Sequence, residues 1–144
     1  MQMKGKVLLG FSIMLAAAGI TSLANAASTT LVSITPQKIV ANDTNANIAL
    51  SKSGLQSVFE SDATNLVLHD GNNARDVFLK VGSSISRVSV NSLGYEARNS
   101  RSGVDWFDAT NYADSTNASI SSDGKLVAFQ SQADNLDQLT LDTN

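Results

Sequence analysis

The sequence predicts an all-β fold of antiparallel, four-stranded repeat units, and three observations support this. Short runs of apolar and β-branched residues recur along the chain, each about five residues long. Clusters of Ser, Asn, Asp and Gly separate these runs, and no helical periodicity follows Ile20. The third observation is an internal repeat, which is the feature that decides the architecture of a repeat protein.

The clearest repeat relates residues 51–66 to residues 121–136 without a gap, at an offset of 70 positions. Seven of the sixteen positions are identical. They are Ser51/Ser121, Gly54/Gly124, Phe59/Phe129, Ser61/Ser131, Ala63/Ala133, Asn65/Asn135 and Leu66/Leu136. Ungapped agreement of this kind indicates two copies of one structural unit.

A second match lies outside that window. Leu31-Val-Ser-Ile34 recurs as Arg87-Val-Ser-Val90 at an offset of 56, so the second unit holds fourteen extra residues, which fall around residues 102–117. The repeat units therefore span about residues 29–91 and 86–144.

The N-terminus has the three-part pattern of a secretory signal peptide. Lys4 and Lys6 precede an apolar run at residues 7–20, and Ala24 and Ala26 follow in the small-residue arrangement of a cleavage site. The alternative is a membrane anchor, but the run is shorter than the roughly 20 apolar residues that a bilayer span needs. We therefore expect a signal peptide at 1–26, a mature domain at 27–144, and a periplasmic or secreted protein that is not held in the membrane after cleavage.

The first strand of the mature chain is expected at residues 29–35, where Thr30, Val32 and Ile34 alternate with their neighbours. Pro36 ends it, because proline has no N–H to donate to a strand ladder. The same composition predicts six further strands, separated by turns at positions such as Gly54 and Gly82. These are residues 47–51, 55–61, 76–81, 85–91, 118–121 and 125–131.

Charge and cysteine content exclude several classes of function. The whole chain carries ten basic and thirteen acidic residues, and removal of residues 1–26 leaves eight against thirteen, a net charge of −5. A surface of this sign repels nucleic acid and anionic membranes. The chain has no cysteine, which excludes disulfides, thiolate catalysis and cysteine-type zinc sites.

The repeat unit contains four spaced motifs, Ser51-Lys-Ser-Gly54, Ser57-Val-Phe-Glu-Ser61, Asp76-Val-Phe-Leu79 and Arg87-Val-Ser-Val90. With these motifs it resembles one blade of the WD-repeat-like propellers of the TolB-like bacterial family, and Ser122-Asp-Gly-Lys-Leu-Val-Ala-Phe129 is a closer copy of the family pattern. Ser53 departs from the acidic residue that the family places before the glycine. The resemblance implies an incomplete β-propeller of about one and a half blades, in which stacked blades bury one another's apolar faces.

The resemblance also implies a function, since propellers of this type present loops to partners. We expect a non-enzymatic scaffold that binds a protein or a glycan. The alternatives are a fragment of a propeller-bearing secreted hydrolase or lyase, and a truncated remnant without activity. Because a closed ring uses at least four blades, self-association through open sheet edges is a further expectation.

One turn has the spacing of a calcium loop. Asp70, Asn72 and Asp76 place oxygen ligands at positions one, three and seven, but position twelve is Val81 rather than a glutamate. The alternative is a polar hairpin turn in which Asp and Asn bond their own backbone. No other cofactor is expected.

His69 is the only histidine, so a transition-metal site is not expected, and no serine of the mature chain stands in a G-x-S-x-G elbow. Catalysis is therefore not predicted, and His69 is interpreted as an exposed turn residue. Trp106, Phe107 and Tyr112 lie in the fourteen-residue insertion. Exposed aromatic residues of this kind predict a binding loop, and the alternative is that they cover apolar surface on their own blade.

Overall fold

The computed structural model describes residues 8–10, 29–99 and 113–137, and within these ranges the chain forms strands and no helix. The strands are β1 (Leu8–Gly10), β2 (Thr29–Leu31), β3 (Asn45–Leu50), β4 (Gln56–Ser61), β5 (Asp76–Val81), β6 (Ser84–Arg87), β7 (Ser115–Ile120) and β8 (Val127–Ser131). Every pair of neighbouring strands is antiparallel. The prediction of an all-β, antiparallel fold is confirmed for this part of the chain. No helix in the described ranges is long and apolar enough to cross a membrane.

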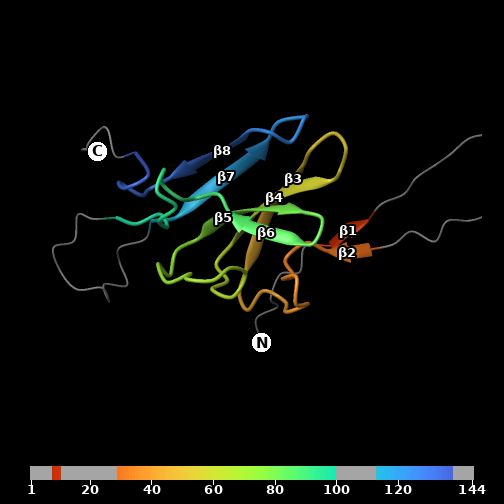
Figure 1. The fold of residues 1–144 in the computed structure, drawn as a ribbon, viewed down its shortest axis with the longest axis horizontal. Helices are drawn as coiled ribbons and strands as arrows, with labels where there is room; N and C mark the ends of the chain where they lie inside the picture. Colours follow the sequence, from red (N-terminus) through yellow and green to blue (C-terminus); the bar gives the residue numbers. More distant parts are fainter. Residues whose placement is uncertain (1–7, 11–28, 100–112, 138–144) are drawn as a thin grey trace, which may run out of the picture.

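The centre of the molecule is a four-stranded meander in the order β3-β4-β5-β6 (Figure 1). β5 covers the predicted residues 76–81 without a shift. The turn between β3 and β4 closes with a hydrogen bond from Gly54 N–H to Ser51 O, at 2.9 Å. Gly54 has a φ of 70°, a backbone conformation that glycine adopts without steric cost.

Two smaller pairs accompany this sheet. β7 and β8 form a hairpin, and β1 pairs with β2. β1 lies inside the segment that the sequence identifies as a signal peptide, and no strand was predicted there. The signal peptide itself remains a prediction, because most of residues 1–26 lie outside the described ranges.

The 70-residue repeat is visible in the backbone hydrogen bonds. Gly124 N–H donates to Ser121 O at 2.9 Å, as Gly54 does to Ser51. A bulge interrupts β3 and β7 at corresponding places, where Asn47 and Asn117 have φ angles of 40° and 55°. Asparagine tolerates this left-handed conformation better than most residues. The bulge also explains why β7 begins three residues before the predicted strand 118–121, since it breaks the alternation along the chain.

The 56-residue repeat is equally regular. Residues 29–41 and 85–97 each form a short strand, then a turn that an isolated bridge closes, Ile34↔Val40 in one and Val90↔Glu96 in the other. For this reason β2 and β6 are shorter than the predicted strands 29–35 and 85–91. The carbonyls of Ser33 and Ser89 accept the N–H groups of Ala41 and Ala97, at 3.0 and 3.1 Å, within these turns instead of continuing a ladder.

The apolar core lies where residues 29–41 pack against the central sheet. Phe59 and Phe78, both 0% exposed, stack with ring centroids 5.7 Å apart, and they form one cluster with Val32 and Ala41. The β7–β8 hairpin packs elsewhere, and Ala118 N–H donates to Glu60 Oε1 of β4 at 3.1 Å. The hairpin therefore contacts the central sheet mainly through β7, which lies against β3, β4 and β5.

Candidate functional site

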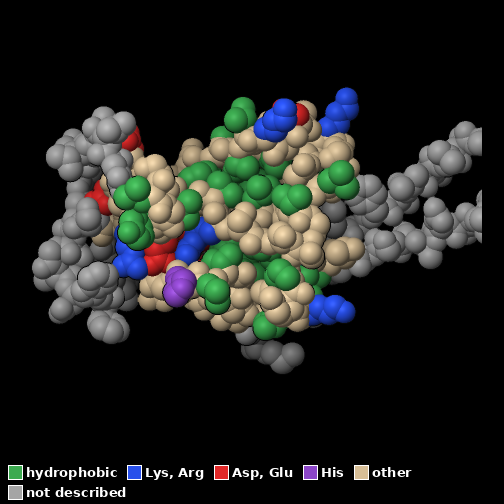
Figure 2. All heavy atoms as spheres, in the orientation of Figure 1, with side chains coloured by type: hydrophobic (Ala, Val, Ile, Leu, Met, Phe, Trp, Pro, Cys, Tyr) green, Lys and Arg blue, Asp and Glu red, His purple; other side chains and the backbone are tan. Residues whose placement is uncertain are grey.

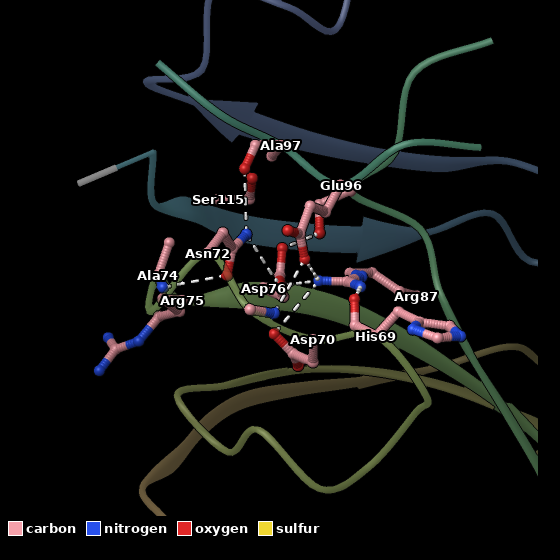
Figure 3. Close-up of polar contacts among 12 residues, drawn as sticks. His69, Asp70, Asn72, Ala74, Arg75, Asp76, Arg87, Glu96, Ala97 and Ser115 are labelled. Carbon is pink, nitrogen blue, oxygen red and sulfur yellow. Dashed lines mark hydrogen bonds and ion pairs between the residues drawn. The ribbon is translucent and has the colours of Figure 1, made fainter. Parts of the chain in front are cut away.

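The densest polar cluster of the described residues surrounds Arg87, at the end of β6 (Figure 3). Its Nη1 atom lies 2.8 Å from Asp76 Oδ2, 3.0 Å from Glu96 Oε2 and 3.2 Å from Asp70 Oδ1. Its Nη2 atom donates to His69 O at 2.9 Å. None of the four charged side chains is more than 8% exposed. We call these four residues, Asp70, Asp76, Arg87 and Glu96, the charge cluster.

The three carboxylates reach Arg87, at the end of β6, from three different segments. Asp76 begins β5, Asp70 comes from the loop before β5, and Glu96 comes from the turn after β6. Asp76 Oδ1 accepts a hydrogen bond from Ser89 Oγ at 2.5 Å. Each carboxylate of the charge cluster interacts with the same guanidinium. The cluster therefore holds the loop of Asp70 and the turn of Glu96 against the central sheet. Figure 2 shows acidic and basic side chains meeting beside the purple His69.

Burial changes the acidities of the charge cluster unequally. Burial raises the pKa of Asp70 to about 6 from its ordinary value of 3.8, and the charges of Asp76 and Glu96 add to this while Arg87 opposes it. Burial also raises the pKa of Asp76, against the hydrogen bonds from Ser89 and Arg87. The pKa of Glu96 is lowered, because hydrogen bonds from Gly71 N–H and Arg98 outweigh its burial. Arg87 is thus shared by three carboxylates, Arg98 is a second partner of Glu96, and Asp70 is the least stabilised as an anion.

The raised pKa of Asp70 predicts a pH-dependent stability. The folded state holds the Asp70 proton more tightly than the unfolded state, so its stabilising contribution is complete below pH 3.8 and is lost as the pH rises to about 6. Relative to Asp70→Asn, the wild-type free energy of unfolding should fall by about 1–3 kcal/mol between pH 4 and pH 6.5. Urea unfolding at several pH values measures this difference. A pH-independent difference would contradict the assignment.

The predicted calcium ligands lie near one another, but their oxygens have other partners. Asp70 and Asp76 accept from Arg87, and Asn72 Oδ1 accepts from Ala74 N–H at 3.1 Å. In the described part of the chain, no group of three or more His, Asp or Glu side chains is arranged to hold a metal ion. The calcium prediction therefore still rests on the sequence spacing alone.

The other predicted site residues do not join this cluster. His69 is exposed, with a φ of 60°, and only its backbone carbonyl contacts Arg87. Trp106, Phe107 and Tyr112 lie outside the described residues, so the predicted binding loop remains a prediction. Sequence reasoning missed Arg87 and Glu96, although the repeat held a signal. The first unit has Leu31 and Val40 at these positions, so a charge pair replaces an apolar pair.

A second candidate surface is the outer side of the β7–β8 hairpin. In the first unit the corresponding residues of β4, Val58, Phe59 and Glu60, are 0%, 0% and 2% exposed. Their counterparts in β8 are open, since Phe129 is half-buried and Ala128 and Gln130 are exposed. β5 covers the edge of β4, whereas β8 pairs only with β7 among the described strands.

Backbone hydrogen bonds show which groups of β8 face this open edge. Ser121 N–H donates to Leu126 O at 2.9 Å, and Gln132 N–H donates to Asp114 O at 3.0 Å, both on the β7 side. Since backbone groups alternate in direction along a strand, every second residue between them faces away from β7. The outward-facing residues are Val127, Phe129 and Ser131. We call their edge the β8 edge.

The face of the hairpin is open as well. In the first unit, Glu60 Oε1 accepts from Asn47 Nδ2 at 2.8 Å and from Ala118 N–H of the next unit. In the second unit, Gln130 Oε1 accepts from Asn117 Nδ2 at 2.7 Å, and both of these residues are exposed. The pair of Asn117 and Gln130 therefore corresponds to the pair of Asn47 and Glu60, but it lies at the surface, whereas Glu60 also bonds to the next unit.

No protein-family model, no curated protein and no solved structure matches this chain. Its function must therefore be inferred from its own residues and from the differences between its two repeat units.

Proposed function

We propose that this chain is an exported, non-enzymatic scaffold of the propeller type, which binds a protein partner through the β8 edge. One observation carries the proposal. The strand β4 is covered by β5, whereas β8, its repeat, presents an open edge and an open face in the described ranges. A row of unpaired backbone donors and acceptors is a template for a further strand.

The propeller assignment is supported by the stacking of the units. The four-stranded meander is followed by a hairpin that repeats its first two strands and packs on it, with inter-unit hydrogen bonds such as Ala118 to Glu60. The TolB-like sequence pattern agrees with this order of strands. Export is supported by the leader-like residues 1–26.

The open surface favours a protein partner over a glycan. Strand addition uses the backbone N–H and C=O groups that Val127, Phe129 and Ser131 direct outward, and an extended peptide provides the complementary groups at the same spacing. The carboxylates of the charge cluster are engaged by Arg87. We therefore assign the cluster a structural role and place the proposed binding at the β8 edge.

The binding test uses a peptide with the sequence of residues 74–83, which contains β5, the strand that covers β4. We expect this peptide to slow hydrogen exchange at the amides of the β8 edge in the full chain. Val127→Pro should weaken this protection at least about tenfold in apparent affinity, because proline removes an outward N–H without touching the β7 ladder. The control is Val127→Ala, which keeps the N–H.

Two results would contradict the proposal. One is unchanged exchange at the β8 edge at saturating peptide. The other is equal protection in Val127→Pro and Val127→Ala, since the backbone donor would then play no part.

A further inference from the structure

The β8 edge has the composition of a strand that can pair with a copy of itself. β8 reads Val-Ala-Phe-Gln-Ser, so it contains no charged residue, no proline and no glycine. Natural proteins usually protect an exposed edge strand with lysine or proline, because an unprotected edge pairs with other chains. Ala128, Gln130 and Ser131 are exposed, and β7 lies between β8 and the central sheet (Figure 1). The described strands therefore leave this edge unprotected.

The first repeat unit shows what a strand at this place offers to its neighbour. β4, the counterpart of β8, pairs with β5 so that Phe59 lies opposite Phe78. The two rings stack with their centroids 5.7 Å apart, and both are 0% exposed. Phe129 is the counterpart of Phe59, but it is only half-buried, and no ring stacks on it among the described residues. An incoming strand therefore fits best with an aromatic residue opposite Phe129.

Charge is the second requirement, and it favours a neutral strand. In the first unit Asp76 lies opposite Ser61, and Arg87 neutralises it with Nη1 2.8 Å from Oδ2. This arginine belongs to β6, and the second unit has no counterpart of β6 in the described ranges. A carboxylate opposite Ser131, the counterpart of Ser61, would lack that partner. A strand with neutral residues therefore suits the β8 edge better than a strand with the charges of β5.

β8 itself meets both requirements. When two copies of β8 pair antiparallel about a twofold axis at Phe129, the two Phe129 residues lie opposite one another and Val127 lies opposite Ser131. The backbone groups of these three residues face away from β7, so each residue exchanges N–H and C=O hydrogen bonds with the residue opposite. The aromatic pair repeats the pairing of Phe59 with Phe78. Every side chain of β8 is neutral, so no like charges face one another.

We infer that the partner of the β8 edge is a second copy of this chain, paired through β8 with Phe129 opposite Phe129 and Val127 opposite Ser131. The hairpins of the two copies then form one continuous antiparallel sheet in the order β7-β8-β8-β7. A single pair of five-residue strands buries less than the roughly 1,200 Å² of a stable interface, so the dimer is reversible and a peptide competes with it. This inference rests on the proposed function, since it assigns a partner to the same edge.

Disulfide formation between engineered cysteines tests the register, because the chain contains no cysteine of its own. In this register the Cα atoms of Val127 and of Ser131 in the other copy lie about 5.5 Å apart, which a disulfide can bridge. Two Val127 residues lie about 14 Å apart, which is too far. Oxidation of an equal mixture of Val127→Cys and Ser131→Cys chains should therefore give at least about tenfold more mixed disulfide than disulfide between identical chains. Mass spectrometry distinguishes these products.

Sedimentation velocity of the full chain over a concentration series tests the association itself. The wild type should shift from monomer to dimer as its concentration rises. Val127→Pro should weaken the dimer at least about tenfold, because it removes one outward N–H from each copy, and Val127→Ala, which keeps the N–H, is the matched control. An excess of the peptide of residues 74–83 should return the wild type to monomer, since the peptide occupies the same edge.

The outcomes separate this inference from the proposed function. If the chain stays monomeric and gives no excess of mixed disulfide, but the peptide still protects the β8 edge from exchange, the second copy is refuted as the partner and the binding edge is retained. If neither a dimer nor peptide binding is observed, both proposals fail. A dimer as strong in Val127→Pro as in Val127→Ala, or a preference for disulfides between identical chains, would place the contact elsewhere and overturn the inference.

Discussion

Replacement of Arg87 by leucine should destabilise the fold by about 3–5 kcal/mol at pH 7. The guanidinium is the shared partner of Asp70, Asp76 and Glu96, and all of these side chains are nearly or fully buried. Removing it leaves three carboxylates close together, two of which, Asp70 and Asp76, already have raised pKa values. Since a small domain has a total stability of only about 5–15 kcal/mol, a large part of the chain should unfold.

Chemical denaturation at two pH values measures this effect and its cause. At pH 4 the difference between Arg87→Leu and the wild type should shrink, because the unpaired carboxyl groups become protonated. The matched control is Arg75→Ala, which removes an ion pair to Asp62 at 2.7 Å whose side chains are 31% and 33% exposed. It should cost at most about 1 kcal/mol. Similar losses of unfolding free energy in the two variants would show that the charge cluster does not stabilise the fold as we infer.

Phe59→Ala should cost about 3–5 kcal/mol, and the same change at its repeat position, Phe129→Ala, about 1–2 kcal/mol. Phe59 is fully buried and stacks on Phe78, so its removal leaves a cavity in the main core. Phe129 is half-buried and has no β5 counterpart beside it in the described ranges. The two residues occupy the same position of the repeat, so the comparison tests the effect of coverage by neighbouring strands.

Calorimetry of both variants, with and without the peptide of residues 74–83, completes this test. Peptide binding at the β8 edge should make Phe129→Ala more costly, because the added strand buries the ring. Its effect on Phe59→Ala should be small. A loss at Phe129 as large as that at Phe59 in the free protein would mean that the second unit is already covered, and it would weaken the proposed function.

The local sequence predicted the positions of the strands from β2 onward and revealed the repeat, although several strand ends differ. β5 contains a short apolar run, Val77, Phe78 and Leu79, and ends before the turn residue Gly82, so its bounds match the prediction. The turns at Gly54 and Gly124 also follow from local chemistry, since glycine adopts positive φ freely. Local patterns failed where backbone geometry departs from regular alternation, as at the bulge residue Asn117 and at the turn after β2.

The candidate sites depended on contacts that local patterns do not encode. Asp70 and Asp76 drew attention because their spacing resembles a calcium loop, yet Arg87 reaches them from a strand 11 residues beyond Asp76. Glu96 comes from another turn. Only the folded chain shows that one guanidinium lies among the three carboxylates, since no periodicity links their positions.

By itself the sequence determined an all-β chain with a repeated unit, because strand periodicity, turn residues and internal identity are all local properties. The tertiary structure decided which copies of that unit are complete. Phe59 and Phe129 are the same residue at equivalent positions, but Phe59 is fully buried and Phe129 only half-buried, because β5 covers only Phe59 in the described ranges. Burial depends on which strands lie alongside in space, and this is the property from which the β8 edge is inferred as a binding site.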